Sequence, residues 1–337
     1  MTTSTGGSPW AVEAHGLVKT FGDNRAVDGI DLRIRTGAVY GFLGPNGAGK
    51  TTTIRMLATL LRPDAGTATV FGRDVARESQ AVRSLIGVTG QYASVDESLS
   101  ATENLVLFAR LLGLSRGDAR RTSVALLEEF GLAEAAARPL KNFSGGMRRR
   151  LDLAASLIAQ PPLIFLDEPT TGLDPRTRLQ MWDTVRRLVA GGSTVLLTTQ
   201  YLDEADQLAD RIAVIDRGQL VAEGTGAELK ASVGTSRLQI GLAEPADEPE
   251  ALRIARAVLG VEPTRAPDGR LSAPVPTADS AGDLLVALRT AGIPLHDIAV
   301  QEPTLDEVFL TLTRHASAAA APAEDDAQDR DLEEARA

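Results

Sequence analysis

Runs of apolar residues alternate with helical patterns in the N-terminal part of the chain. Residues 38–43, 163–166 and 194–197 are almost unbroken apolar runs, which is typical of strands that are buried on both faces of a sheet. Between the first two runs, apolar residues recur at helical spacing over residues 105–130. The alternation predicts a layered α/β fold, with a helical subdomain inserted into the sheet domain at about residues 92–160.

Two short motifs mark expected helix starts. Ser100 precedes Glu103 by three residues, and Thr304 precedes Glu307 in the same way. In such a capping box the hydroxyl accepts a hydrogen bond from the backbone of the glutamate, whose side chain accepts one from the backbone of the capping residue. We therefore expect helices to begin directly after Ser100 and Thr304.

The pattern restarts in a smaller form after an expected linker at residues 225–235. Three strand-like and three helical stretches then alternate, which predicts a small α/β domain of the order βαβαβα. The strands are expected at residues 238–242, 271–275 and 298–300, and the helices at residues 252–259, 284–288 and 305–312. The expected division is a flexible N-terminus (1–10), a first domain (11–235), a C-terminal domain (236–314) and a disordered acidic tail (315–337).

The composition restricts the chemistry. The 337 residues include no cysteine, which excludes disulfides, thiol nucleophiles, iron–sulfur clusters and cysteine zinc sites. The formal charge is −10 at pH 7, from 35 basic and 45 acidic residues, so we expect no nucleic-acid partner. No apolar run approaches the roughly 18 residues that a membrane span needs, and the N-terminal residues do not resemble a signal peptide.

A phosphate-binding loop is the strongest motif. Residues 44–51 match the pattern G-x-x-x-x-G-K-[ST] and stand between an apolar run and the helical spacing of residues 54–61. In this context the glycines let consecutive N–H groups face an anion, the lysine reaches the outer phosphates, and the threonine hydroxyl binds Mg²⁺. The alternative is a glycine-rich turn. We assign nucleotide binding to Gly44, Pro45, Asn46, Gly47, Ala48, Gly49, Lys50, Thr51 and Thr52.

A second acidic motif ends the apolar run at residues 163–166. Asp167 and Glu168 follow it directly. Alone, an acidic strand end is a weak signal, but its position behind a phosphate loop predicts that Asp167 joins Thr51 in the magnesium shell and that Glu168 activates water.

Phe143-Ser-Gly-Gly-Met147 resembles the signature of ABC-type ATPases, the nucleotide-binding subunits of ATP-binding cassette transporters. Met147 replaces the usual glutamine. The resemblance implies a P-loop NTPase fold with a RecA-like sheet core, an inserted helical subdomain and a small α/β C-terminal domain. It also implies a homodimer, in which Ser144, Gly145 and Gly146 meet the ATP that the partner subunit binds, at the start of a helix.

The same resemblance assigns three further positions. Phe21 matches the aromatic residue that stacks on adenine, although a core phenylalanine is an equal alternative. Gln91 matches the glutamine that joins the metal shell and the catalytic site to the membrane partner. Asp174 matches the loop that contacts the other subunit, and with Pro175 it is also an ordinary helix cap.

Gln200 departs from the wider family, which usually has histidine at this position. An amide keeps one donor and one acceptor but carries no titrating proton. Gln200 is therefore a candidate for binding the γ-phosphate or the attacking water, while Glu168 is the expected base.

Three consecutive arginines follow the signature, at positions 148, 149 and 150. A basic run of this kind suggests nucleic acid. However, consecutive residues fan out around a helix instead of sharing one face, so we interpret them as a solvated or paired surface.

The amino-acid sequences of three segments resemble those of the daunorubicin/doxorubicin resistance ATP-binding proteins. The segments are residues 143–152, 198–206 and 305–310. This implies an ATPase that lies peripherally on the cytoplasmic face of the cell membrane. It would energise export of a drug or antibiotic, which a separate integral membrane permease binds. An exporter of another cargo, such as a lipid or polysaccharide, and a non-transport regulatory ATPase are the alternatives.

Overall fold

The computed structural model describes residues 9–89, 95–266, 268–275 and 277–319. The chain divides into two compact units, Met1–Gly226 and Ala227–Ala337. Each is described by itself.

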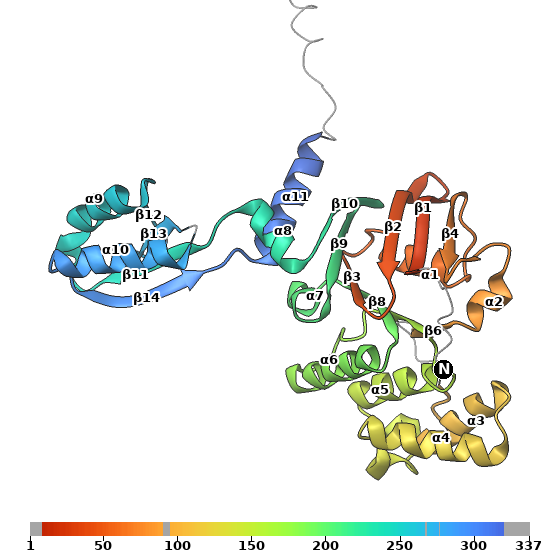
Figure 1. Ribbon diagram of the computed structural model, residues 1–337. Coiled ribbons are helices and arrows are strands. Elements are labelled where there is room, and N and C mark those ends of the chain that lie inside the picture. The colour runs from red at the N-terminus through yellow and green to blue at the C-terminus, as the bar shows by residue number, and fades with distance from the viewer. Residues whose placement is uncertain (1–8, 90–94, 267, 276, 320–337) are drawn as a thin grey trace, which may run out of the picture. The chain divides into compact units, whose positions relative to one another are not determined.

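A six-stranded sheet forms the centre of the first unit, in the order β10-β9-β3-β8-β7-β6 (Figure 1). All neighbouring strands are parallel except β9 and β10. Every residue of β3, β7 and β8 is buried, so the unbroken apolar runs are strands of the sheet interior, as predicted. The strands are β3 (Val39–Leu43), β6 (Ile86–Thr89), β7 (Leu163–Asp167), β8 (Thr194–Thr199), β9 (Arg211–Asp216) and β10 (Gln219–Gly224).

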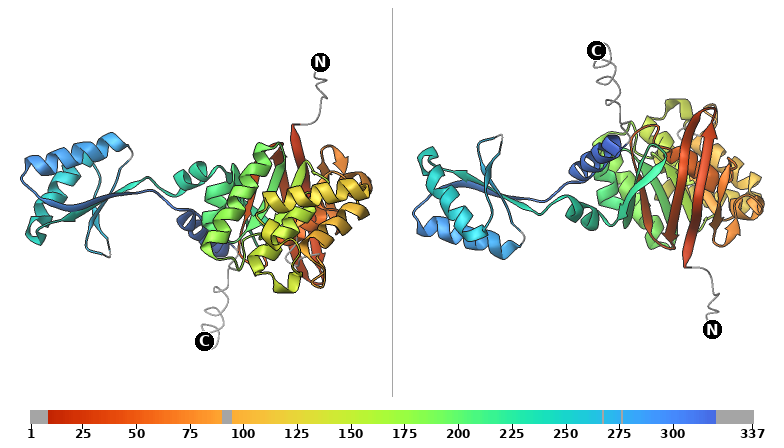
Figure 2. Two further views of the ribbon diagram at one scale, coloured as in Figure 1. Left: turned by 90° about the horizontal axis from the view of Figure 1, so that it is seen from below. Right: turned by 90° about the horizontal axis from the view of Figure 1, so that it is seen from above.

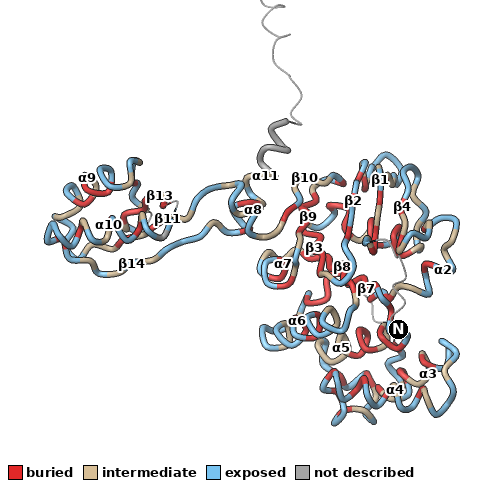
Figure 3. The backbone as a smooth tube through the Cα atoms, viewed as in Figure 1, coloured by how far each residue is buried: buried red, intermediate tan, exposed pale blue. Residues whose placement is uncertain are grey.

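A second, antiparallel sheet has the order β2-β1-β4-β5. Helix α1 (Lys50–Leu57) packs its buried residues Ile54, Met56 and Leu57 into the hydrophobic core that this sheet shares with the central sheet. Figure 3 shows this interior as buried. The strands are β1 (Trp10–Phe21), β2 (Asn24–Arg35), β4 (Ala65–Val70) and β5 (Arg73–Asp74), followed by helix α2 (Ser79–Arg83).

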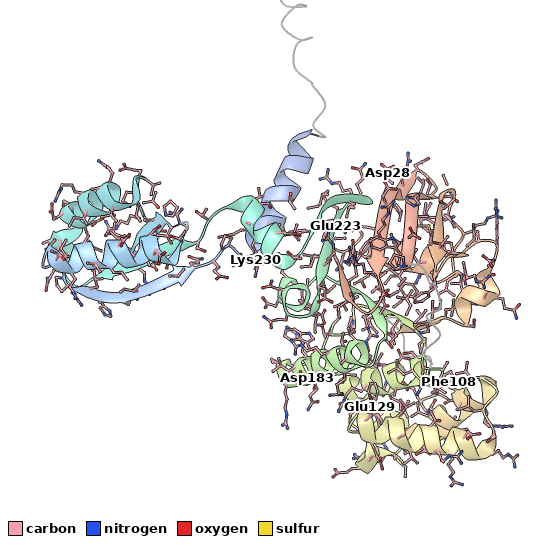
Figure 4. The ribbon with its side chains drawn as sticks, in the orientation of Figure 1. Asp28, Phe108, Glu129, Asp183, Glu223 and Lys230 are labelled. Atoms are coloured by element: carbon pink, nitrogen blue, oxygen red, sulfur yellow. The ribbon has the colours of Figure 1, made fainter. Side chains whose placement is uncertain are left out.

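Helices cover the other side of the central sheet. Seen from below, the first unit presents helices, and seen from above, it presents the antiparallel sheet (Figure 2). Phe108 and Glu129 lie in the helical segment at the opposite end of this unit from Asp28 of β2 (Figure 4). The helices are α3 (Ala101–Leu111), α4 (Arg116–Glu129), α5 (Gly145–Ser156), α6 (Pro175–Ala190) and α7 (Leu202–Leu208), with short 3-10 helices at Ala133–Ala135 and Leu140–Asn142.

The capping box at the start of α3 is present: Glu103 N–H donates to Ser100 Oγ (3.2 Å), and Ser100 N–H donates to the Glu103 carboxylate (2.8 Å). The apolar residues that stand at helical spacing in this region are only partly buried. Leu105 is in the core, but Leu111 is 73% exposed and Leu112 54% exposed. These two leucines stand at the end of α3, beyond the part of the helix that packs on the core.

The second unit contains a four-stranded antiparallel sheet in the order β12-β13-β11-β14. Leu238 and Ile240 of β11 are buried with Ile254 of α9 and Leu284 of α10 in one hydrophobic cluster. The elements are α8 (Gly226–Val233), β11 (Arg237–Leu242), a 3-10 helix (Pro245–Asp247), α9 (Glu248–Leu259), β12 (Thr264–Arg265), β13 (Leu271–Pro274), α10 (Ala278–Thr290), β14 (Leu295–Gln301) and α11 (Leu305–Ala319).

Three details of this unit differ from the sequence prediction. Helix α8 occupies most of the expected linker, because Ala, Glu, Leu and Lys favour helix. A short strand, β12, pairs with β13 and adds to the expected order. Helix α11 runs past Arg314 to Ala319, where alanine is the best helix former. The remaining tail lies outside the described residues.

Candidate active site

The phosphate loop has the strand–loop–helix context that its sequence predicts. It connects β3 to α1, and Gly49 caps the helix with a φ of 102°. A Cβ atom at Gly49 would lie 2.3 Å from the carbonyl oxygen of Ala26, and one at Gly44 would lie 2.3 Å from that of Ile215. Neither position can carry a side chain without moving backbone.

Lys50 is buried at the start of α1, with 4% of its surface exposed. Its Nζ donates to the carbonyl oxygens of Gly44 (2.7 Å) and Pro45 (3.1 Å) and lies 3.5 Å from Glu168 Oε1. Burial lowers the pKa of Lys50, and the charge of Glu168 opposes that shift. The ammonium group is thus kept beside the loop by oxygen atoms that a phosphate could replace.

Thr51, Asp167 and Thr198 form a chain of oxygen atoms. The Thr51 hydroxyl donates to Asp167 Oδ1 (3.1 Å), and the Thr198 hydroxyl donates to the same oxygen (2.6 Å). A threonine hydroxyl beside a carboxylate is the oxygen ligand set that Mg²⁺ prefers. Sequence reasoning missed Thr198, which directly follows the apolar run at residues 194–197 and has no charged group to mark it.

Glu168 has an unusual backbone conformation. Its φ is +49°, in the left-handed region that a residue with a side chain rarely adopts. Its N–H donates to the carbonyl oxygen and to the hydroxyl of Thr198, both at 3.1 Å. Its carboxylate accepts a hydrogen bond from the Thr171 hydroxyl (3.3 Å). The side chain is 8% exposed and is fixed next to Lys50.

A cavity of about 540 Å³ brings these segments together. It is lined by the phosphate loop from Asn46 to Thr52 and by Phe21, Glu168 and Gln200. Phe21 is 50% exposed, so it is not a core residue. Asn24, Ala26 and Thr171 also line the cavity; sequence reasoning missed them, although each stands within five residues of a predicted site residue.

The signature residues do not line this cavity. Ser144 caps α5 by accepting a hydrogen bond from Met147 N–H (3.3 Å). A Cβ atom at Gly146 would lie 2.5 Å from Thr177 Cγ2, whereas one at Gly145 would have no neighbour within 4 Å. Packing on α6 therefore explains Gly146, and nothing in the described part of this chain explains Gly145.

Asp174 is the N-cap of α6, as its alternative interpretation predicts. Its carboxylate accepts hydrogen bonds from Thr177 N–H (3.0 Å) and from the Thr177 hydroxyl (2.7 Å). The Thr177 hydrogen bonds hold the pKa of Asp174 below its usual value. Gly146 packs on the same threonine, so the starts of α5 and α6 lie together. Gln91 lies outside the described residues.

The three arginines after the signature have three different environments. Arg148 pairs with Glu97 (2.6 Å), as the paired interpretation expects. Arg150 donates to the carbonyl oxygen of Phe130 (3.0 Å). Arg149 does not lie on a solvated surface: it is partly buried and donates to carbonyl oxygens at the end of β7. A sequence pattern gives no signal for such a contact with backbone.

Comparison with known proteins decides the family. The family described as "ABC transporter" matches residues 27–171, and "ATP-binding protein DrrA1-3-like, C-terminal domain" matches residues 224–313. The chain is 55% identical over 326 residues to the "Daunorubicin/doxorubicin resistance ATP-binding protein DrrA" of Streptomyces peucetius, covering 96% of both chains. The chain belongs to this family of ABC ATPases. The resemblance and the ATPase fold expected from the motifs are confirmed.

Two further likenesses agree. The ABC ATPase is 53% identical over 306 residues to the "Daunorubicin resistance ATP-binding protein DrrA3" of Streptomyces coeruleorubidus, covering 90% of this chain and 96% of that protein. A solved "ATP binding subunit of ABC transporter" matches with a TM-score of 0.60 and 26% identity, over 66% of this chain and 92% of that chain. Over the described residues, no helix of the ABC ATPase is both long and apolar enough to cross a membrane.

Proposed function

We propose that this ABC ATPase binds and hydrolyses ATP to energise efflux of a drug or antibiotic through a separate integral membrane permease. The observation that carries the proposal is its 55% identity, over 96% of the chain, to a protein named for daunorubicin/doxorubicin resistance. The cavity beneath Phe21 provides the ATPase site. The permease binds the drug, and the ATPase is peripheral on the cytoplasmic face of the membrane.

The residues of the cavity fit Mg²⁺ and ATP. Thr51 and Asp167 place two oxygen ligands next to each other, and Gln91 is the third proposed ligand. Lys50 exchanges its carbonyl contacts for phosphate oxygens, and Phe21 stacks on adenine. When bound, Mg²⁺ neutralises charge on the phosphate groups. Glu168 accepts the proton of the attacking water, and the Gln200 amide orients that water or the phosphate.

A homodimer completes the site. Ser144, Gly145, Gly146 and Asp174 do not line their own chain's cavity. The open space around Gly145 at the start of α5 suits a phosphate bound to the partner subunit, because the N–H groups of a helix start attract anions. We also propose that residues 11–235 act as the ATPase domain and residues 236–314 as a separate C-terminal domain, flanked by terminal segments 1–10 and 315–337.

The test is co-expression of the full-length chain with its membrane partner in a drug-sensitive host. We expect drug efflux and ATPase activity that the drug stimulates, and loss of both in Lys50→Ala. Lys141→Ala, which removes an exposed lysine outside the cavity, is the matched control and keeps both. If a lipid or polysaccharide, but not the drug, stimulated the ATPase and was exported, the proposed cargo would be wrong. An Lys50→Ala complex with full efflux would overturn the mechanism.

A further inference from the structure

Arg149 connects the signature helix to the strand end that carries Glu168. It stands on α5, and its guanidinium group donates to the carbonyl oxygens of three successive residues. The Nη2 atom donates to Asp167 O and Glu168 O, both at 2.8 Å, and the Nε atom donates to Pro169 O at 3.3 Å.

These contacts fix the peptide groups around a strained residue. Glu168 has a φ of +49°, and such a conformation persists only where surrounding contacts enforce it. Thr198 binds the N–H of Glu168 from β8, while Arg149 binds its carbonyl oxygen from α5. Hydrogen bonds therefore hold the backbone of Glu168 at both its N–H group and its carbonyl oxygen. The contact with the carbonyl oxygen comes from Arg149, on the helix that begins with the signature.

The electrostatic surroundings suit a permanent positive charge. Burial lowers the pKa of Arg149, and the nearby carboxylates of Asp152, Asp167 and Glu168 oppose that shift. An arginine keeps its proton at physiological pH even so. Its planar group presents several donors in fixed directions, whereas lysine presents one compact ammonium group on a flexible stem. Lysine cannot reproduce three contacts with successive carbonyl oxygens.

We propose that Arg149 is a positioning residue: it orients Glu168 for proton abstraction and couples the position of α5 to that orientation. The inference rests on the proposed ATP hydrolysis with Glu168 as base. A displacement of α5, when its N-terminal end meets nucleotide on the partner subunit, then reaches the Glu168 peptide through one side chain.

The experiment uses the full-length chain assembled with its membrane partner and measures turnover against ATP concentration. Arg149→Gln is expected to lower kcat about tenfold or more, a loss typical of groups that orient a reacting residue, with KM for ATP changed by less than about twofold. Arg149→Lys is expected to restore part of kcat. Arg150→Gln removes a guanidinium group from the same helix that donates to Phe130 O, and it is the control that keeps kcat.

A double-mutant cycle separates positioning from a general structural role. If Arg149 acts through Glu168, Arg149→Gln causes no further loss of single-turnover hydrolysis in a Glu168→Gln background. An equal factor in both backgrounds, or an equal loss in Arg150→Gln, would overturn the inference. If Glu168→Gln itself left turnover unchanged, the proposed function would fail instead. Thermal unfolding of each variant checks folding, and Arg149→Lys provides the test should Arg149→Gln not fold.

Discussion

The Lys50 ammonium lies 3.5 Å from Oε1 of Glu168, and the two side chains are 4% and 8% exposed. Two charges at such a buried position are stable together, because each would be costly to bury alone. We propose that Lys50 binds phosphate and that Glu168 is the base. Binding of nucleotide would then remove the ammonium partner of the carboxylate and leave it available to a water proton.

The variant Glu168→Gln tests whether Glu168 acts as the base. The amide keeps the size of the side chain and a contact atom for Lys50 but cannot accept a proton. We expect ATP binding to be retained while turnover falls by about 10²–10⁴-fold, the usual contribution of a general base. Equilibrium binding of labelled ATP and a steady-state phosphate-release assay measure the two effects. Glu250→Gln, an exposed carboxylate paired with Arg253, is the control, and equal turnover in both variants would contradict the role of Glu168.

The two signature glycines should respond differently to alanine. Gly146→Ala places a methyl group 2.5 Å from Thr177 Cγ2, so we expect lower stability together with lower turnover. Gly145→Ala meets no atom within 4 Å in this chain, and its stability should change by less than about 1 kcal/mol. Its turnover should nevertheless fall about a hundredfold, because a methyl group displaces the partner's nucleotide.

Chemical unfolding and ATPase assays at the same protein concentration measure both glycine effects. Gly145→Ala with full turnover would argue against the head-to-tail dimer, since no contact within the described chain requires glycine at that position.

The centre of this fold could be predicted from the sequence, because the buried strands of a parallel sheet appear as unbroken apolar runs. Strands β3, β7 and β8 are buried on both faces, so their apolar runs are unbroken and recognisable. The phosphate loop is equally recognisable, because its glycines and lysine stand at fixed spacing in one short segment between a strand and a helix. The helix at residues 226–233 was expected to be part of a linker, since its few helix formers lie between Gly226 and Gly234.

Thr198 and Arg149 could not be predicted in the same way. Thr198 directly follows an apolar run, and only the pairing of β7 with β8 brings its hydroxyl to Asp167. Arg149 contacts main-chain carbonyl groups, which every residue possesses, so no pattern of side chains marks its target. Tertiary contacts between distant segments create both roles.

Thr198→Val should weaken the binding of Mg²⁺ at the active site. Valine has nearly the shape of threonine but cannot donate to Asp167 Oδ1 or accept from Glu168 N–H. We expect the Mg²⁺ concentration for half-maximal ATPase activity to rise about tenfold, as for other groups that orient a metal ligand. A Mg²⁺ titration of ATPase activity measures it.

The matched control for that variant is Thr194→Val, at the other end of the same strand. The Thr194 hydroxyl accepts from Gly37 N–H (2.9 Å), so the substitution removes a partly buried hydrogen bond without touching Asp167. Equal Mg²⁺ dependence in the two variants would show that Thr198 contributes only to the stability of β8.

Because of the buried carboxyl group of Glu204, we expect the stability of the folded protein to depend on pH. It is fully buried on α7, where Trp182 Nε1 donates to its Oε1 (3.1 Å). Burial raises the pKa of Glu204 above its ordinary value of 4.5, and the hydrogen bond from Trp182 opposes the rise. Below pH 4.5 the folded and unfolded chains both bind the proton. As the pH rises further, the unfolded chain releases it first, so this residue makes the protein less stable with increasing pH.

Glu204→Gln removes that dependence while keeping an oxygen that can accept from Trp182. We expect the variant and the parent to have similar free energies of unfolding near pH 4.5, and the variant to gain relative to the parent as the pH rises. Each pH unit between the ordinary and the raised pKa adds about 1.4 kcal/mol to the difference. Urea unfolding at several pH values measures it.

Glu250→Gln should show the opposite trend, because Arg253 lowers the pKa of that exposed carboxyl. A constant difference between Glu204→Gln and the parent would mean that Glu204 is ionised in the folded protein.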